Sequence, residues 1–377
     1  MQVIPEFVRS STWEKVLNFI ATSDEAAPYL LMDKDVVREK ASVIGKGIRN
    51  CRVYYAVKAN PHIEIAGLLD RPGMNYEIAS EGELKILSAL GVKPGRIISS
   101  NPVKSPAFIK HAVDYGVDYF AFDSVAEVDK LAAYAPGCNV YVRLTVPNEG
   151  SEWPLSKKFG IEPDTAVELL LYARERKLNP VGITFHVGSQ CTNIYNWSMA
   201  LDKVSSVWSS AESVGIRLKV LNIGGGYPIR YTKEVIDIQS IEEMIDTLIS
   251  QKFPEDIQVQ LEPGRAVVGD AGVFVTSVIG KARRGNVNWL YIDVGVFNGL
   301  MESIGGIKYK YIVGSRAETQ KWTIAGPSCD SFDVIAHEVE LPEPMIGDHL
   351  LILSSGAYTI SYASEFNGFP VPKTILI

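Results

Sequence analysis

Residues 53–61 read Val-Tyr-Tyr-Ala-Val-Lys-Ala-Asn-Pro, and the whole chain can be interpreted outward from this stretch. Its β-branched and aromatic residues predict a buried strand, Val53–Val57, with Lys58 at the carboxyl end. Seven similar runs follow, separated by polar breaks and by stretches with helical spacing. They are Asn75–Ala79, Arg96–Ser100, Asp118–Phe122, Asn139–Leu144, Val181–His186, Lys219–Ile223 and Gln258–Glu262. Strands alternating with helices predict parallel pairing, and eight such units predict an α/β fold, a (β/α)8 barrel of the TIM type.

The pattern changes after Arg265, where short apolar runs are separated by glycine, proline and charged turns. These runs include Val273–Ile279, Trp289–Asp293, Trp322–Ala325 and Leu350–Leu353. Few helices fit between them, so we expect a mostly antiparallel β domain, sandwich-like or barrel-like, over residues 265–377. The run Pro28-Tyr-Leu-Leu-Met resembles an entering strand, which assigns residues 1–32 to the same domain and residues 33–264 to the barrel.

Length and composition limit the class of protein. A chain of 377 residues is long enough for two domains, and its 46% hydrophobic and 21% charged residues are typical of a folded protein. The net charge is −7 and no basic tract is present, which argues against nucleic-acid binding. No apolar stretch approaches the roughly 18 residues of a membrane span, and Met1–Glu6 does not begin a signal peptide.

Cysteine and histidine usage favours a reduced, cytoplasmic protein without a metal site. The four cysteines, Cys51, Cys138, Cys191 and Cys329, form no CxxC pair. The five histidines show no spacing typical of metal ligands.

Reactive residue types fall at the predicted strand ends, where the active site of a (β/α)8 barrel lies. Lys58 ends the first strand, His186 the sixth and Glu262 the eighth, while Gly224-Gly-Gly follows the seventh. A poorly solvated lysine amine can attack an aldehyde, glycine N–H groups can bind phosphate, and a carboxylate can pair with a protonated ring nitrogen. Each feature alone also has an ordinary explanation: a lysine reaching solvent, a flexible turn, a core histidine, or an ion pair of Glu262 with Arg265.

Ten short motifs, taken together in their order, are far more specific than any one alone. They are YAVKANP, NYEIASEGEL, SSNPVK, FDSVAEVDKL, KFG, FHVGSQC, NIGGGYP, LEPGR, GPSCDSFDVI and GAYT…FNGF. Over almost the whole chain they resemble the fold type III, alanine-racemase-like decarboxylases that use pyridoxal 5′-phosphate (PLP). The ending Ser364-Glu-Phe-Asn-Gly-Phe resembles the ornithine and lysine branch in particular.

The resemblance implies a role for each matching residue. Lys58 would hold PLP as an imine, Glu262 would bind the ring nitrogen, and His186 would stack on the ring. The residues implied as phosphate ligands are Ser189, Gly225, Gly226, Arg265 and Tyr358. Glu77 stands where ornithine enzymes usually carry an aspartate near the cofactor, and Arg143 matches a buried arginine that braces this region.

The resemblance also implies a homodimer with composite active sites. Cys329 would protonate the substrate carbon after carbon dioxide leaves, and Cys329 and Asp330 would reach the site of the neighbouring subunit. Asp330 and Glu302 would suit the distal ammonium of a basic amino acid. The segment 293–308 has no arginine for a distal carboxylate, and Phe297 stands where ornithine enzymes usually have a tyrosine.

Several alternatives stay open from the sequence. The substrate is ornithine, lysine or both, with arginine, diaminopimelate or a carboxylated polyamine as further options, because one methylene is worth only about 1–3 kcal/mol in a pocket. An amino-acid racemase, a non-catalytic PLP-binding homologue, and a barrel that binds another phosphate ligand with a structural Lys58 are the other classes.

Overall fold

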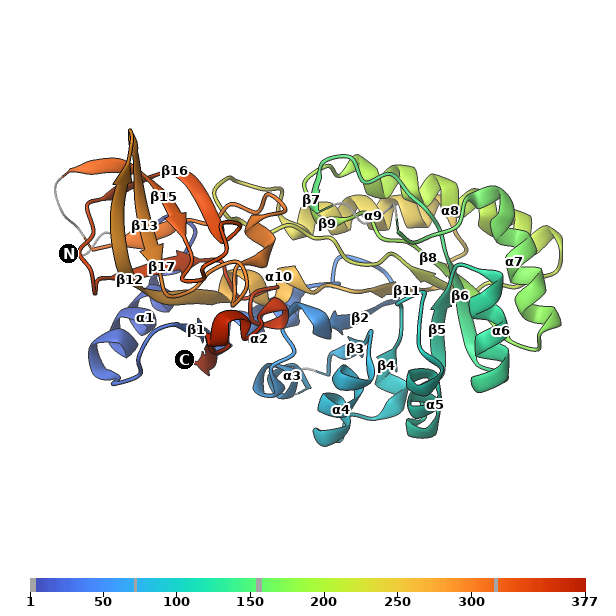
Figure 1. Cartoon of the computed structure of the whole chain (residues 1–377). Helices are drawn as coiled ribbons and strands as arrows, with labels where there is room; N and C mark the ends of the chain where they lie inside the picture. Colours follow the sequence, from blue (N-terminus) through green and yellow to red (C-terminus); the bar gives the residue numbers. More distant parts are fainter. Residues whose placement is uncertain (1–4, 71–72, 154–157, 315–317) are drawn as a thin grey trace. The chain divides into compact units, whose positions relative to one another are not determined.

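The computed structural model describes residues 5–70, 73–153, 158–314 and 318–377. Residues 1–4, on which the expectation about a signal peptide partly rests, lie outside these ranges. The chain forms two compact units (Figure 1). The barrel unit comprises residues 41–228 and 236–264, and the β unit comprises residues 1–40, 229–235 and 265–377.

All eight predicted strands of the barrel are present, and the predicted (β/α)8 fold is confirmed. They are β2 (Cys51–Ala56), β3 (Asn75–Glu77), β4 (Ile97–Ile98), β5 (Tyr119–Phe122), β6 (Asn139–Arg143), β8 (Asn179–Thr184), β10 (Val220–Asn222) and β11 (Gln258–Leu261). They pair in parallel in the order β4-β3-β2-β11-β10-β8-β6-β5. The two ends of this sheet meet at Ser99, whose N–H donates to the carbonyl of Tyr119 (3.0 Å) and whose carbonyl accepts from the N–H of Ala121 (2.9 Å).

Helices alternate with the barrel strands. They are α3 (Ile63–Asp70), α4 (Glu81–Ala89), α5 (Pro106–Tyr115), α6 (Val125–Tyr134), α7 (Pro163–Glu175), α8 (Tyr195–Ser213) and α9 (Ile238–Lys252). Four begin at a side-chain cap, in which Ser80, Ser105, Ser124 or Asp237 accepts a hydrogen bond from the backbone three residues on. A short antiparallel pair, β7 (Ser151–Trp153) and β9 (Ser189–Cys191), also belongs to this unit.

The β unit contains a mixed sheet. Its strands are β1 (Tyr29–Met32), β12 (Gly272–Arg284), β13 (Val287–Ile292), β14 (Tyr311–Val313), β15 (Thr319–Ala325), β16 (Val334–Pro342), β17 (His349–Leu353) and β18 (Lys373–Leu376). The main order is β14-β17-β12-β13-β15-β16, and β1 pairs with both β12 and β18. Pairing is antiparallel except for β1 with β18 and β13 with β15, so the mostly antiparallel prediction holds.

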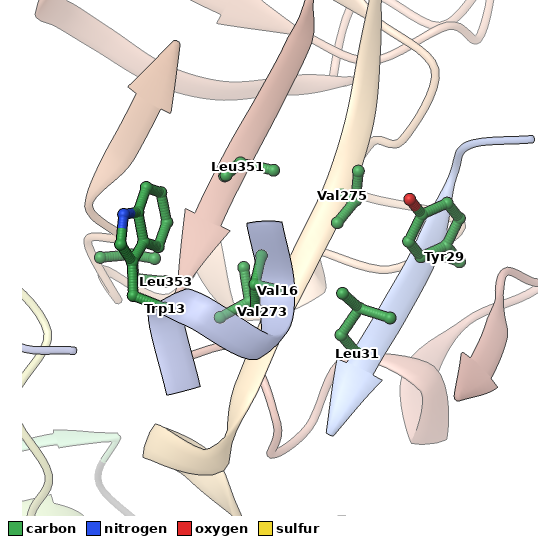
Figure 2. Close-up of a cluster of buried hydrophobic side chains, with 8 residues drawn as sticks. All are labelled: Trp13, Val16, Tyr29, Leu31, Val273, Val275, Leu351 and Leu353. Atoms are coloured by element: carbon green, nitrogen blue, oxygen red, sulfur yellow. The ribbon is translucent and has the colours of Figure 1, made fainter. Parts of the chain in front are cut away.

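A hydrophobic cluster explains why the N-terminal segment joins the β unit. Helix α1 (Ser10–Thr22) places Trp13 and Val16 over one face of the sheet (Figure 2). That face carries alternate residues of β1, β12 and β17, because side chains two apart in a strand point the same way. The partners are Tyr29, Leu31, Val273, Val275, Leu351 and Leu353.

Two short segments that we expected in the barrel group instead with the β unit, namely residues 33–40 and 229–235. The first covers most of helix α2 (Lys34–Val43). Its backbone and side chains bond within the β unit: the N–H of Asp33 donates to Ala271 (2.9 Å), and Lys40 pairs with Asp270 (2.7 Å). The second segment is held by the hydroxyl of Ser354, which donates to the carbonyl of Arg230 (2.8 Å). The two units also divide between residues 264 and 265.

Across the described ranges, no helix combines the length and the apolar character needed to cross a membrane.

Candidate active site

Lys58 lies directly after β2, in the short 3-10 helix Val57–Ala59. Its Nζ is 2.6 Å from Oε2 of Glu77, the last residue of β3. β2 and β3 are parallel neighbours with Ala56 opposite Glu77, so their carboxyl ends bring these two side chains together. The side chain of Lys58 is 44% exposed and that of Glu77 only 1%, so a buried carboxylate holds an accessible amine at the carboxyl ends of the strands.

Glu262 lies directly after β11 and is buried, and the hydrogen bonds that its carboxylate accepts within the described residues all reach one oxygen, Oε1. Its Oε1 accepts from the hydroxyl of Ser100 and from Nδ2 of Asn222 (2.5 Å). The Ser100 hydroxyl also bonds the hydroxyl of Tyr141 (2.7 Å), which extends the network across the barrel. Burial and the charge of Glu77 raise the pKa of Glu262 to about 6. Within the described ranges no group donates to its Oε2, which remains as an acceptor.

His186 is neutral at physiological pH. Burial, followed by the positive charges of Arg143 and Lys58, lowers its pKa to about 3. Its Nδ1 accepts a hydrogen bond from the N–H of Gly188 (3.0 Å), so the proton of the neutral ring is assigned to Nε2. Arg143 ends β6, and burial lowers the pKa of its guanidinium.

The glycine run after β10 packs tightly against the strand ends that carry His186 and Glu262. Gly224 and Gly226 have φ values of +63° and +103°, which favour glycine. A Cβ at Gly225 would lie 2.3 Å from the carbonyl oxygen of Glu262 and 3.6 Å from Nε2 of His186. The run therefore needs glycine, and its backbone lies beside both functional side chains. Ser189 begins β9, three residues after His186.

The β unit contains a buried cluster around Arg265. Its Nη1 and Nη2 lie 2.8 and 2.7 Å from the two carboxylate oxygens of Glu302, and Nη1 also bonds the hydroxyl of Tyr231. The guanidinium carbon is 4.8 Å from the ring centroid of Tyr358. Because Glu302 uses both oxygens for Arg265, the structure argues against it as a free ligand for a substrate ammonium. That assignment stays a prediction.

Cys329 and Asp330 share one exposed loop of the β unit, between β15 and β16. Both the N–H and the thiol of Cys329 bond Oδ1 of Asn367. Oδ1 of Asp330 accepts from the N–H of Phe332 (2.9 Å). Phe297 follows β13, with its ring centroid 4.6 Å from that of Phe366.

The chain is similar to known pyridoxal-dependent proteins in sequence and in fold. Residues 34–269 match the family described as "Pyridoxal-dependent decarboxylase, pyridoxal binding domain". The chain belongs to this family. The lysine/ornithine decarboxylase of Selenomonas ruminantium is 38% identical over 355 residues, covering 93% of this chain and 89% of the relative.

Solved structures of pyridoxal-dependent decarboxylases share the whole fold. A structure described as SrLDC in complex with PLP and cadaverine has a TM-score of 0.89 at 35% identity, covering 100% of this chain and 95% of that chain. The lysine/ornithine decarboxylase of Vibrio vulnificus, complexed with cadaverine, has a TM-score of 0.90 at 31% identity, covering 98% and 99%.

The residues of the barrel unit fit PLP, the cofactor of pyridoxal-dependent decarboxylases. Oε2 of Glu262 is an acceptor suited to a ring N–H, and the neutral ring of His186 can lie against a cationic ring without like-charge repulsion. Lys58 offers an amine at the open end of the barrel. The glycine run, with positive φ at Gly224 and Gly226, can bring backbone N–H groups close to an anion.

The structure brings together the predicted residues within each unit. Lys58, Glu77, Arg143, His186, Ser189, Gly225, Gly226 and Glu262 all lie at or just after the carboxyl ends of barrel strands. Arg265, Tyr358 and Glu302 cluster in the β unit, and Cys329 and Asp330 share a loop of the same unit. Their roles towards cofactor and substrate stay predictions.

Sequence reasoning missed several residues of the decarboxylase site. Ser100 is the last residue of a predicted strand and Asn222 the last but one of another, and this position near a strand end was the signal that could have revealed them. Tyr141 lies inside β6 and carries no such signal. Glu83 accepts from the N–H of Ala79 (2.6 Å), and burial with the charge of Glu77 raises its pKa to about 7. Glu83 lies in the first turn of α4, where an acidic residue is common, so the sequence carries no sign of its raised pKa.

Proposed function

We propose that the protein removes the carboxylate of ornithine or lysine as carbon dioxide, producing putrescine or cadaverine for polyamine biosynthesis. The arrangement of Lys58, Glu77 and Glu262 at one end of the barrel carries this proposal. The named activity of the Selenomonas relative and the diamine in the Vibrio structure support the substrate class.

Bound PLP supplies an electron sink for the pair released when the carboxylate leaves. The chain's own groups provide the rest. Lys58 would hold the cofactor through its amine, and Glu77, 2.6 Å from that amine, would stabilise it as an ammonium whenever it is not bonded to the cofactor. Glu262 would hold a proton at the ring nitrogen through Oε2, while Ser100 and Asn222 keep its carboxylate in place through Oε1. The neutral ring of His186 would cover one face of the cofactor ring and exclude water from it.

We assign the phosphate to the glycine run, with Gly225, Gly226 and Ser189 as N–H or hydroxyl donors. Arg265 and Tyr358 remain proposed phosphate ligands from the β unit. Because Arg265 is paired with Glu302, its charge is partly neutralised before phosphate arrives, so we expect the backbone donors to contribute more to binding.

Asp330 is the carboxylate that we propose for the distal ammonium of the substrate. It is exposed, and only Oδ1 takes part in its local turn. Phe297 would line the apolar part of the pocket. Since lysine is one methylene longer than ornithine, the two should differ by about 1–3 kcal/mol in transition-state binding.

We propose that the protein is a cytoplasmic homodimer in which Cys329 and Asp330 serve the neighbouring subunit's site. Their exposure, together with the 57% exposed ring of Phe332 in the same loop, supports this. Mixing the Lys58→Ala and Cys329→Ala proteins tests it, because heterodimers would contain one intact site. Recovery of activity on mixing is expected, and a monomer in light scattering would contradict the proposal.

A carbon dioxide release assay tests the main proposal. Ornithine, lysine, arginine, diaminopimelate and a carboxylated polyamine are compared side by side, with Lys58→Ala as control. We expect ornithine or lysine to give the highest kcat/KM, and Lys58→Ala to lose both turnover and the visible absorbance of bound PLP. A preference for diaminopimelate would refute the substrate class. Enantiomer exchange without gas release would indicate a racemase.

A further inference from the structure

Asn367 makes two hydrogen bonds to Cys329 through one atom. Its Oδ1 accepts from the backbone N–H of Cys329 (3.1 Å) and from the thiol (3.3 Å between S and O). The residues are 38 positions apart, and Asn367 lies in the C-terminal segment that follows β17. The thiol therefore has a defined direction although it lies on an exposed loop.

The backbone at Asn367 suits this contact. Its φ and ψ are 57° and 15°, in the left-handed region that asparagine tolerates better than most residues. The segment is also fixed to the loop after β13: the N–H of Ser364 donates to the carbonyl of Phe297 (2.8 Å), and the rings of Phe366 and Phe297 are in contact. The acceptor is thus presented by an anchored turn.

The loop of Cys329 is fixed from its other side by Asp333. The buried carboxylate of Asp333 accepts from the N–H of Ser328 (3.0 Å) through Oδ2. Ser328 directly precedes Cys329, so adjacent peptide groups are held by Asp333 and Asn367. Little of the loop can move without breaking one of these bonds.

We propose that Asn367 is a positioning residue for Cys329, and that its amide oxygen holds the thiol in a fixed direction until the proton is transferred. An amide oxygen has no proton to donate at this atom, so it accepts from the S–H group and fixes its direction. This inference rests on the proposed role of Cys329. In that step the thiol gives its proton to the carbon that has lost carbon dioxide, sulfur keeps the S–H electron pair, and water reprotonates the thiolate. A thiol is a weak donor, so it leaves the amide oxygen at small cost.

Two substitutions separate the acceptor from the backbone conformation. Asn367→Gly accepts the positive φ but removes Oδ1, whereas Asn367→Asp keeps an oxygen acceptor and also tolerates this conformation. Asn367→Ala would be less informative, because it would remove the hydrogen bond to Cys329 and also strain the backbone at a positive φ. Cys329→Ser supplies the control without a thiol.

The rate at which iodoacetamide alkylates the holoenzyme near neutral pH measures the reactivity of the Cys329 thiol. Cys138 and Cys191 are buried, and burial raises the pKa of Cys51 to about 12, so Cys329 is the cysteine expected to react. We expect Asn367→Gly to be alkylated several-fold faster than wild type, because a hydrogen bond of about 1 kcal/mol corresponds to roughly fivefold. Asn367→Asp should react no faster than wild type. An unchanged rate in Asn367→Gly would overturn the inference.

Turnover provides the second readout. Asn367→Gly should lower kcat several-fold with little change in KM. It should also raise the fraction of product protonated at a carbon other than the one that has lost carbon dioxide. Asn367→Asp should restore both kcat and the normal product. If Asn367→Gly and Asn367→Asp lost kcat equally, or if only KM changed, the positioning role of Asn367 would be contradicted. Alkylation needs no substrate, so the two hypotheses can fail separately. If Cys329→Ala keeps normal turnover and clean product, the role of Cys329 is refuted whatever the alkylation rates show.

Discussion

Arg265 and Glu302 form a two-point ion pair inside the β unit, with N–O distances of 2.8 and 2.7 Å and exposures of 3% and 2%. Glu302→Ala leaves a guanidinium buried without its counter-charge, so we expect a loss of about 3–5 kcal/mol in the free energy of unfolding. Urea denaturation measures it. The matched control is Glu343→Ala, which breaks the more exposed pair with Lys281 and should cost at most about 1 kcal/mol.

This pair also separates the two interpretations of Glu302. If Glu302 bound the distal ammonium of the substrate, Glu302→Gln would raise KM strongly and leave stability nearly unchanged. The ion pair with Arg265 predicts instead that Glu302→Gln lowers stability and changes KM little.

His186 should make the protein less stable as the pH falls. Its pKa in the folded state, about 3, lies below its ordinary value near 6.5, so between these values the unfolded chain binds more protons. The contribution is complete above pH 6.5 and is lost on acidification. Comparing wild type with His186→Phe, both free of cofactor, the stability difference should shift by about 2 kcal/mol between pH 7 and pH 5. Parallel pH profiles would contradict the assignment.

Glu262 should have the opposite pH dependence. Its folded pKa of about 6 lies above the ordinary value near 4.5, so its protonated form favours folding and stability falls as the pH rises through this window. In the cofactor-free protein at pH 7, Glu262→Gln should therefore be more stable than wild type by about 2 kcal/mol. Its kcat should fall at least about 100-fold, because an amide does not hold a proton at the ring nitrogen. A variant with normal turnover would remove Glu262 from the mechanism.

Asp333 joins the loops that follow two parallel strands, β13 and β15. Its Oδ1 accepts from the N–H of Val296 (2.7 Å) and its Oδ2 from the N–H of Ser328 (3.0 Å). Asp333→Asn turns one acceptor into a donor, and we expect a loss of about 1–3 kcal/mol by thermal or urea unfolding. The control in the same loop is Asp330→Asn, which keeps its local turn. It should leave stability unchanged and raise the substrate KM.

The sequence alone predicted the parts of this protein that depend on local periodicity. The eight barrel strands and the reactive residues at their ends were readable because each strand carries its own buried run, and parallel strands bring their carboxyl ends to one side. β16 escaped prediction because charged residues such as Glu338 and Glu340 interrupt its apolar pattern. The ten motifs indicated the family because their order was preserved along the chain.

Only the tertiary structure decided which groups pair. Nothing near Glu302 in the sequence indicates that Arg265, 37 residues away, occupies both of its oxygens, and nothing near Cys329 indicates Asn367. Residues 33–40 and 229–235 likewise join the β unit through bonds to distant segments. The physical reason is that strand patterns arise from neighbouring residues, whereas ion pairing, burial and the direction of a proton depend on which loops the folded chain brings together.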